Sequence, residues 1–119
     1  NFGDNDTLSA TVAEMVGADM LILLSDIDGL YTDDPNRNAQ AEFISLVEHV
    51  DDRLLAMGKG PGSGVGTGGM ATKLNAAQLC LEAGVDMVIA NGARMEALYD
   101  IVEGKNVGTR FSARRGALQ

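Results

Sequence analysis

Two short apolar runs limit what this chain can fold into. The runs are Met20–Leu24 (MLILL) and Val85–Ala90 (VDMVIA), each of strand length. A strand-length apolar run without regular polar alternation is typical of a strand buried on both faces, as in parallel sheets covered by helices. The first run stops at Ser25-Asp26 and the second at Asn91-Gly92, residue types that favour turns.

Segments with the apolar spacing of helices alternate with these runs. A helix is predicted from Asp6, a residue suited to the N-cap, to Val16, with apolar residues at Leu8, Val12, Met15 and Val16. Two further helices are predicted over residues 70–83 and 94–102. Each of the three is followed by a glycine that favours the left-handed conformation closing a helix: Gly17, Gly84 and Gly104.

Weaker signals complete the order of elements. A short strand is predicted over 43–47, a short helix over 51–57 and a last short strand over 107–111. Turns are expected at Asp28-Gly29 and over 33–36, which are rich in turn-forming residues. The alternation of helices with apolar strands predicts an α/β sandwich with a largely parallel sheet.

The composition is that of one globular domain with an aliphatic core. The chain has 119 residues, of which 45% are hydrophobic but only 4% aromatic. Its net charge of −8 argues against a nucleic acid or an anionic membrane as the main partner, because both attract basic surfaces. No apolar run approaches the ~20 residues that span a bilayer. The single cysteine, Cys80, is expected to be a buried small hydrophobe, and its isolation fits a reducing cytoplasm.

The segment GSGVGTGGMATK, residues 62–73, is the strongest candidate for a functional loop. It could be a flexible linker, a phosphate-binding loop or a structural turn, and the short chain after it argues against a linker. Glycines let backbone N–H groups approach an anion, the following helix presents its positive end, and Lys73 lies in the first turn. No Gly-Lys-Ser/Thr occurs, so the segment is not a Walker A loop. Composition alone leaves the phosphate and structural interpretations about equally supported.

Two further polar groups allow both a structural and a functional interpretation. Asp4, Asn5 and Asp6 precede the first predicted helix, where a single residue suffices as a cap; the surplus could meet a ligand. Ser25 and Asp26 end a buried strand, and ligands in α/β proteins bind beyond the carboxyl ends of strands. Taken alone, the residues favour a helix cap and an Asx turn respectively.

Read together, four segments resemble the glutamate 5-kinases of the amino acid kinase family. The segments are GDNDTLSA, LSDIDGLYTDDP, SGVGTGGMATKLNAA, and ANG with VEGKNVGTRF, in this order over essentially the whole chain. SGVGTGGMATKLNAA is the most specific of them, whereas LSDIDGLYTDDP is shared more widely in the family. The resemblance implies a three-layer α/β/α sandwich with a mainly parallel central sheet.

The resemblance also implies an activity and a set of site residues. The activity is transfer of the γ-phosphoryl group of ATP, with Mg²⁺, to the side-chain carboxylate of L-glutamate, the first step toward proline. Lys73 and Asp6 match catalytic positions, Asp6 by orienting lysines, and Asn5 matches a glutamate-binding position. Ser25 stands where threonine is common and Ala71 where serine is common. The ATP-binding positions are Ser25, Asp26, Thr67, Gly68, Gly69, Met70, Ala71, Thr72 and Lys73.

The same resemblance implies that residues 1–119 are the C-terminal, nucleotide-binding part of one kinase domain. The chain begins with Asn1 rather than methionine, and a helix is its first predicted element, so the sheet is expected to be incomplete at its N-terminal side. Alone, the chain is expected to bind ATP weakly and to catalyse nothing. The complete enzyme is expected to be a cytoplasmic homo-oligomer, with proline as a candidate feedback inhibitor. Alternatives are a family member with another acceptor, such as aspartate or a nucleoside monophosphate, and a non-catalytic nucleotide-binding regulatory module.

Overall fold

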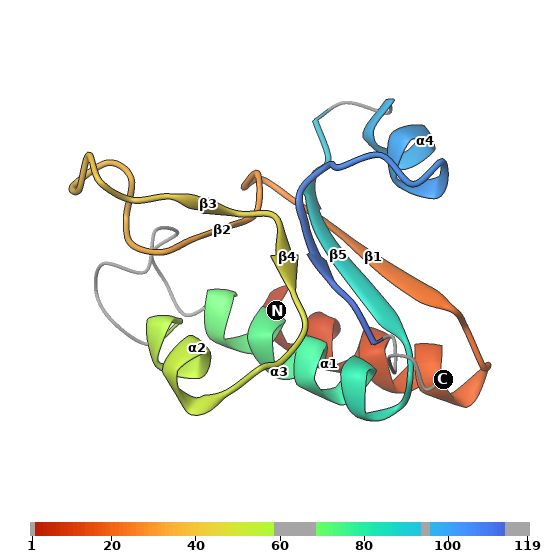
Figure 1. The fold of residues 1–119 in the computed structure, drawn as a ribbon. Coiled ribbons are helices and arrows are strands. Elements are labelled where there is room, and N and C mark those ends of the chain that lie inside the picture. The colour runs from red at the N-terminus through yellow and green to blue at the C-terminus, as the bar shows by residue number, and fades with distance from the viewer. Residues whose placement is uncertain (1, 59–68, 94–95, 114–119) are drawn as a thin grey trace.

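The structure is a computed structural model that describes residues 2–58, 69–93 and 96–113 (Figure 1). The predicted long helices and apolar strands occur in the predicted order, but short strands and a short helix between the first apolar strand and the second long helix interrupt the alternation. The elements are α1 (Phe2–Met15), β1 (Met20–Ser25), β2 (Leu30–Tyr31), β3 (Phe43–Ile44), β4 (Leu46–Val47), α2 (Asp52–Met57), α3 (Gly69–Glu82), β5 (Asp86–Asn91), α4 (Glu96–Val102) and β6 (Thr109–Phe111). In the described part of the chain, no helix combines the length and the hydropathy that a membrane span needs.

The two apolar runs form neighbouring strands of a four-stranded sheet, in the order β1-β5-β6-β4. β1 and β5 are parallel, and their register runs from Met20 opposite Asp86 to Ser25 opposite Asn91. β4 and β6 are also parallel, whereas β5 and β6 are antiparallel. The sheet is therefore mainly parallel, as expected, with one reversal that periodicity did not indicate.

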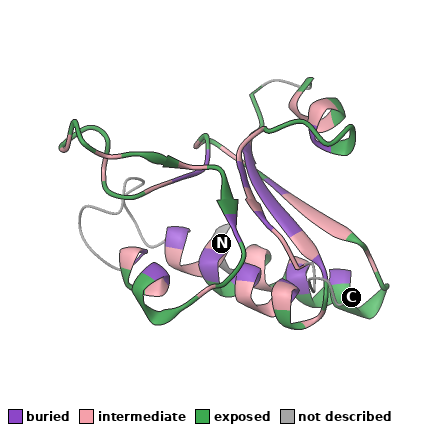
Figure 2. Ribbon diagram, viewed as in Figure 1, coloured by how far each residue is buried: buried purple, intermediate pink, exposed green. Residues whose placement is uncertain are grey.

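Helices cover both faces of this sheet, which makes the three-layer α/β/α arrangement (Figure 1). Side chains of β5 alternate between the two faces, as strand geometry requires. Met87 and Ile89 belong to the large core shared with α3, whereas Val88 and Ala90 pack with Ile101 of α4. β5 is thus buried on both faces, as its apolar run predicts, and Figure 2 shows it as the most continuously buried strand.

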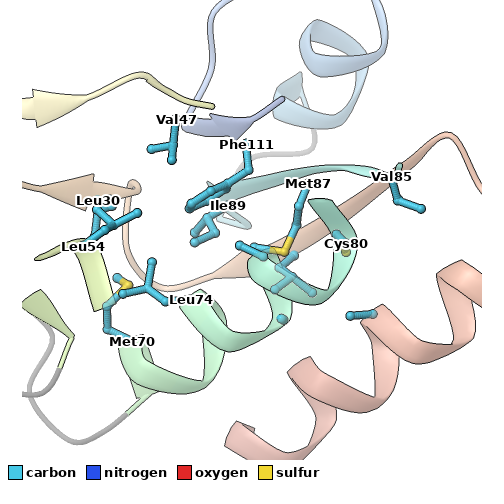
Figure 3. Close-up of a cluster of buried hydrophobic side chains, with 14 of the residues drawn as sticks. Leu30, Val47, Leu54, Met70, Leu74, Cys80, Val85, Met87, Ile89 and Phe111 are labelled. Carbon is cyan, nitrogen blue, oxygen red and sulfur yellow. The ribbon is translucent and has the colours of Figure 1, made fainter. Parts of the chain in front are cut away.

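The large core lies between the sheet and α3. Figure 3 shows Met70 and Leu74 on α3 beneath Ile89 of β5 and Phe111 of β6. Leu74 is fully buried, which is worth roughly 1.5–3 kcal/mol for a side chain of its size. The predicted helix over 70–83 is confirmed, and Cys80 on its buried side is the small core residue that the sequence suggests.

The first helix presents an unexpected face to the core. An apolar stripe at helical spacing usually faces inward. In α1 the stripe of large residues lies outside, between 48% exposed (Val12) and 78% exposed (Met15). The small residues Ala10 and Ala13 are buried instead, in the core cluster that includes Ala76 and Ala77 of α3. Small side chains let the two helices approach closely, which decides the orientation of α1.

β1 is less buried than its apolar run predicts. It lies at an edge of the described sheet, and Leu24 is 47% exposed. Leu21 and Leu23 face the large core, whereas Met20 and Ile22 are only partly buried on the other face. The expectation of burial on both faces is therefore wrong for β1, because α4 covers that face only in part.

The region between β1 and α2 also differs from the prediction. Residues 43–47 were expected to form one strand, but the chain divides at Ser45. β3 pairs with β2 in a separate two-stranded sheet, whereas β4 pairs with β6. The short helix over 51–57 is confirmed as α2, with Asp51 as its N-cap accepting the N–H of Leu54 at 2.8 Å.

Three glycines end helices as predicted. Gly17, Gly84 and Gly104 have φ values of 70°, 79° and 87°, in the left-handed region. The helix predicted over 94–102 is described from Glu96 to Val102, and residues 94 and 95 lie outside the described part.

Candidate functional site

One edge of the sheet collects most of the polar residues that the sequence singles out. β1 and β5 are parallel and end together at Ser25 and Asn91. α1 and α3 each precede one of these strands and return antiparallel to it, so their N-terminal ends point toward the same edge (Figure 1). This is the edge where open α/β sheets bind ligands.

Asp6 of α1 and Lys73 of α3 form an ion pair there. The Lys73 ammonium Nζ donates a hydrogen bond to Asp6 Oδ2 at 3.1 Å. The two side chains are only 14% and 13% exposed, so water shields their interaction less than it does a surface pair. The pair joins residues 67 positions apart in the sequence.

Thr72 completes this cluster. Its hydroxyl lies 2.8 Å from the carbonyl oxygen of Gly69 and 3.4 Å from Asp6 Oδ2. A hydroxyl has one hydrogen to donate, so the shorter bond within α3 is the stronger of the two. Asp6 therefore mainly neutralises and orients Lys73.

The interpretation of Asp6 as a helix N-cap is wrong. α1 begins at Phe2, so Asp6 lies in the second turn of the helix. Its carboxylate bonds Lys73 and not a free N–H at the helix start. The sequence could not indicate this, because the partner comes from a distant part of the chain.

The first turn of α3 supplies backbone donors beside Lys73. Gly69 begins the helix, and the first N–H groups of a helix have no partner within it. Met70 has a buried side chain, 3% exposed, so only its backbone could meet a ligand, whereas Ala71 is half-buried. The predicted ATP-binding residues Thr67 and Gly68, with most of the glycine-rich segment, lie outside the described residues.

The remaining predicted site residues lie in two places: Asn5 is near the start of α1, and Ser25 and Asp26 are where β1 ends and the next turn begins. Asn5 is exposed and immediately precedes Asp6 on α1. Ser25 ends β1, and its hydroxyl lies 3.3 Å from Asp26 Oδ1. Asp26 is exposed, and the Ser25 carbonyl accepts the N–H of Gly92 at 2.8 Å. Among the described residues, no hydrogen bond connects this turn to Lys73.

Two residues that sequence reasoning did not assign to the site hold this turn. Asn91 ends β5, and its side-chain amide donates to Asp28 Oδ1 at 3.1 Å. Thr109 begins β6, is fully buried, and accepts the N–H of Leu30 at 2.8 Å. Both lie in the kinase-like segments ANG and VEGKNVGTRF, but neither the resemblance nor the periodicity indicated what Asn91 or Thr109 contacts.

The acidic turn at 33–36 is structural, as the sequence suggests. Asp33 accepts the N–H of Asp34 and the side-chain amide of Asn38, at 2.7 and 3.0 Å. These hydrogen bonds, that from Asn38 foremost, hold the pKa of the Asp33 carboxyl below its usual value. Asp34 in turn accepts the N–H of Asn36 at 2.9 Å.

The described residues contain no group of three or more histidine, cysteine, aspartate or glutamate side chains that could hold a metal ion. An ammonium, a row of helix N–H groups and a carboxylate that orients the ammonium are suited to an anion. Such donors bind phosphate groups and stabilise negative charge that develops on them during transfer.

Comparison with known proteins identifies the family of this chain. The sequence model described as the amino acid kinase family matches residues 1–91. The glutamate 5-kinase of Clostridium tetani is 54% identical to this chain over 111 residues, which is 93% of this chain and 42% of that protein. The chain therefore spans less than half the length of this relative.

Solved structures resemble the fold at lower sequence identity. The UMP kinase of Bacillus anthracis superposes with a TM-score of 0.67 at 19% identity, over 91% of this chain and 40% of that one. The carbamate kinase of Giardia lamblia, bound to AMP-PNP, gives 0.64 at 20% identity, over 90% of this chain and 31% of that one. At these identities the likeness concerns the fold alone.

Proposed function

This chain belongs to the amino acid kinase family, and we propose that residues 1–119 form the C-terminal, nucleotide-binding part of a glutamate 5-kinase domain. The complete domain would transfer the γ-phosphoryl group of ATP to the side-chain carboxylate of L-glutamate and yield glutamyl 5-phosphate and ADP. The observation that carries the proposal is the Asp6–Lys73 pair at the start of α3. The identity of 54% to a glutamate 5-kinase supports glutamate as the acceptor.

The proposed reaction needs positive charge more than it needs an acid or a base. A glutamate carboxylate is already ionised at pH 7, so its oxygen can attack the γ-phosphorus without proton removal. A bond forms between that oxygen and phosphorus while the bond to the ADP oxygen breaks and its electron pair leaves with ADP. Negative charge spreads over the transferred group, and the Lys73 ammonium with the N–H groups of Gly69–Thr72 is suited to stabilise it.

Asp6 has a supporting part in this mechanism. Its carboxylate would hold Nζ of Lys73 at one position between the two helices, so that the ammonium does not reorganise during transfer. Asn5, next to Asp6 and exposed, would contact glutamate, and Ser25 and Asp26 would contact the nucleotide. The carbamate kinase that shares this fold binds AMP-PNP, an ATP analogue, which supports ATP as the phosphoryl donor.

Within the described residues, no group of three or more histidine, cysteine, aspartate or glutamate side chains could hold Mg²⁺ by itself. Mg²⁺ commonly keeps several waters and binds substrate phosphates with one or two carboxylates. Mg²⁺ bound with ATP would neutralise phosphate charge, in addition to the charge that Lys73 supplies.

Two variants of the complete kinase domain test the proposal. Lys73→Ala should lower kcat for glutamate-dependent ADP formation by about 10²- to 10³-fold, as loss of a preorganised donor does. Lys105→Ala, which removes an exposed lysine paired with Asp100 and Glu103 at the end of α4, should leave kcat unchanged. Equal rates for Lys73→Ala and the parent would contradict the proposed role.

Assays with other phosphoryl acceptors distinguish a glutamate 5-kinase from other family members and from a regulatory module. The parent enzyme should release ADP rapidly with glutamate and slowly with aspartate or UMP. Preference for aspartate or UMP would assign the chain to another member of the family, and nucleotide binding without transfer to any of the three would indicate a regulatory module. The isolated 119 residues should bind ATP weakly and show no turnover.

The remaining parts of the proposal concern the complete enzyme. A glutamate 5-kinase of this kind would act in the cytoplasm at the first step of proline biosynthesis and would form a homo-oligomer. Proline is then the expected feedback inhibitor, and its effect would be measured as a decrease in the rate of ADP release at fixed glutamate.

A further inference from the structure

The hydroxyl of Thr109 connects β6 to both strands of the β2–β3 hairpin. It accepts the N–H of Leu30 at 2.8 Å and donates to the carbonyl oxygen of Ile44 at 2.5 Å. Leu30 and Ile44 face each other in the hairpin ladder. Because Thr109 is fully buried, both bonds are shielded from water, and one hydroxyl fixes the base of the hairpin.

The chain passes directly beside this hydroxyl. Gly29 has a φ of 154°, and a Cβ placed there would lie 2.6 Å from Thr109 Oγ1 and 2.8 Å from Cζ of Phe43. No side chain larger than hydrogen fits at this position without displacing one of these groups. The turn between β1 and β2 therefore ends, at Gly29, in direct contact with Thr109 of β6.

A separate hydrogen bond holds the same turn in its middle. The Asn91 side chain donates to Asp28 Oδ1 at 3.1 Å, while its own oxygen accepts the N–H of Ala93 at 2.9 Å. Asn91 lies opposite Ser25 in the parallel register. The turn that carries Asp26 is thus attached to β5 through Asn91 and to β6 through Thr109.

We propose that Thr109 and Asn91 are positioning residues for the nucleotide, which act through the turn 26–29. The inference rests on the proposed function, in which Ser25 and Asp26 contact ATP. Neither Thr109 nor Asn91 needs to touch the nucleotide. Asn91 holds Asp28 of the turn to β5, and Thr109 holds Leu30, the residue that follows the turn, to β6, so that Asp26 keeps its place when ATP arrives.

The structure explains why such fixing is needed. Asp26 and Asp28 are exposed, so their side chains are not held in place by burial in the core. The position of these two carboxylates therefore depends on how firmly the backbone of the turn is held at Asp28 and at Gly29–Leu30. Without the Thr109 hydroxyl, the Leu30 N–H would lose its acceptor and the turn would sample more conformations, which weakens ATP binding in proportion to the lost population.

The test compares Thr109→Val with Thr109→Ser in the complete kinase domain. Valine keeps the shape of threonine and removes both hydrogen bonds, whereas serine keeps the hydroxyl. Thr109→Val should raise KM for ATP by about three- to tenfold, the factor that a net hydrogen bond is worth, and leave KM for glutamate within about twofold. Thr109→Ser should restore most of the affinity for ATP.

A core variant controls for simple destabilisation. Val85→Ala removes buried methyl groups next to the amino end of β5, at the opposite edge of the sheet. It should lower the melting temperature without changing KM for ATP. If Thr109→Val does not fold, Asn91→Ala removes the exposed Asp28 bond with less effect on the core, and its KM for ATP should rise in the same direction.

Several results would overturn the inference. An unchanged KM for ATP in Thr109→Val, an equal rise of both KM values, or failure of Thr109→Ser to restore binding would each do so. If the parent enzyme releases no ADP with glutamate, the proposed function fails instead, and the positioning role is then read from the affinity for a fluorescent ATP analogue. Loss of analogue affinity in Thr109→Val but not in Thr109→Ser would support it, whereas equal affinities, or a parent that binds no analogue, would refute it.

Discussion

Replacing Asp6 by asparagine isolates the charge of the carboxylate that holds Lys73. The variant keeps the size of the side chain and an oxygen that can accept a hydrogen bond, but it removes the negative charge 3.1 Å from Nζ. Hydrogen bonds between charged groups contribute about 1.5–3 kcal/mol, and the 13–14% exposure of this pair places it among the less screened cases. If this energy is expressed in the transition state, kcat should fall by about 10- to 150-fold.

The assay is glutamate-dependent ADP release by the complete kinase domain, with KM measured for both substrates. KM for glutamate should change little, because Asp6 acts on the ammonium and not on the acceptor. Glu14→Gln is a matched control, since it makes the same charge change two turns further along α1, where the side chain is exposed. The argument fails if Asp6→Asn stays within about twofold of the parent, or if Glu14→Gln loses as much activity.

Three further predictions concern the fold. Gly108→Ala should lower the free energy of unfolding, measured in urea, by about 2–5 kcal/mol. The φ of Gly108 is 72°, and a Cβ there would overlap the carbonyl oxygen of Ile89. A loss below about 1 kcal/mol would contradict this reasoning. On α1, Met15→Gln should change stability by less than about 0.5 kcal/mol, whereas Ala10→Leu should destabilise by about 1–3 kcal/mol, and the reverse order would mean that the helix faces the other way. Burial raises the pKa of the Cys80 thiol from 9.0 to about 11. The neutral thiol therefore stabilises the fold fully below pH 9, and this contribution is lost as the pH rises toward 11. The free energy of unfolding of Cys80→Ala, measured in urea, should lack this decline.

The orientation of α1 shows where reasoning from periodicity stops. Leu8 and Val12 predict a helix correctly, because side chains four apart share a face whatever that face contacts. Which face is buried depends on the partner. α3 offers Ala76 and Ala77, and the close approach this permits favours Ala10 over the larger side chains.

The candidate site divides in a similar way. Lys73 and Thr72 could be identified because a glycine-rich segment followed by a helix is a local pattern. α3 begins at Gly69, so Thr72 ends its first turn and Lys73, predicted in the first turn, begins the second. The resemblance to known kinases assigned Asp6, but the residues around it favoured a helix cap. The contacts of Asn91 and Thr109 could not be predicted, because their partners, Asp28 and Leu30, are 63 and 79 positions away.

The sequence predicted the four helices, the strands β1, β5 and β6, the glycines that end three helices and the kinase-like motifs, but neither β2 nor the division of 43–47 into β3 and β4. The predicted features depend on local backbone preferences and on the spacing of apolar residues, which any reader of the chain can see. Three features could be seen only in the folded chain: β6 runs antiparallel to β5, α1 buries its small residues, and Asp6 pairs with Lys73. Each of those outcomes is a contact between distant segments, and its free energy exists only once both segments are packed on the same sheet.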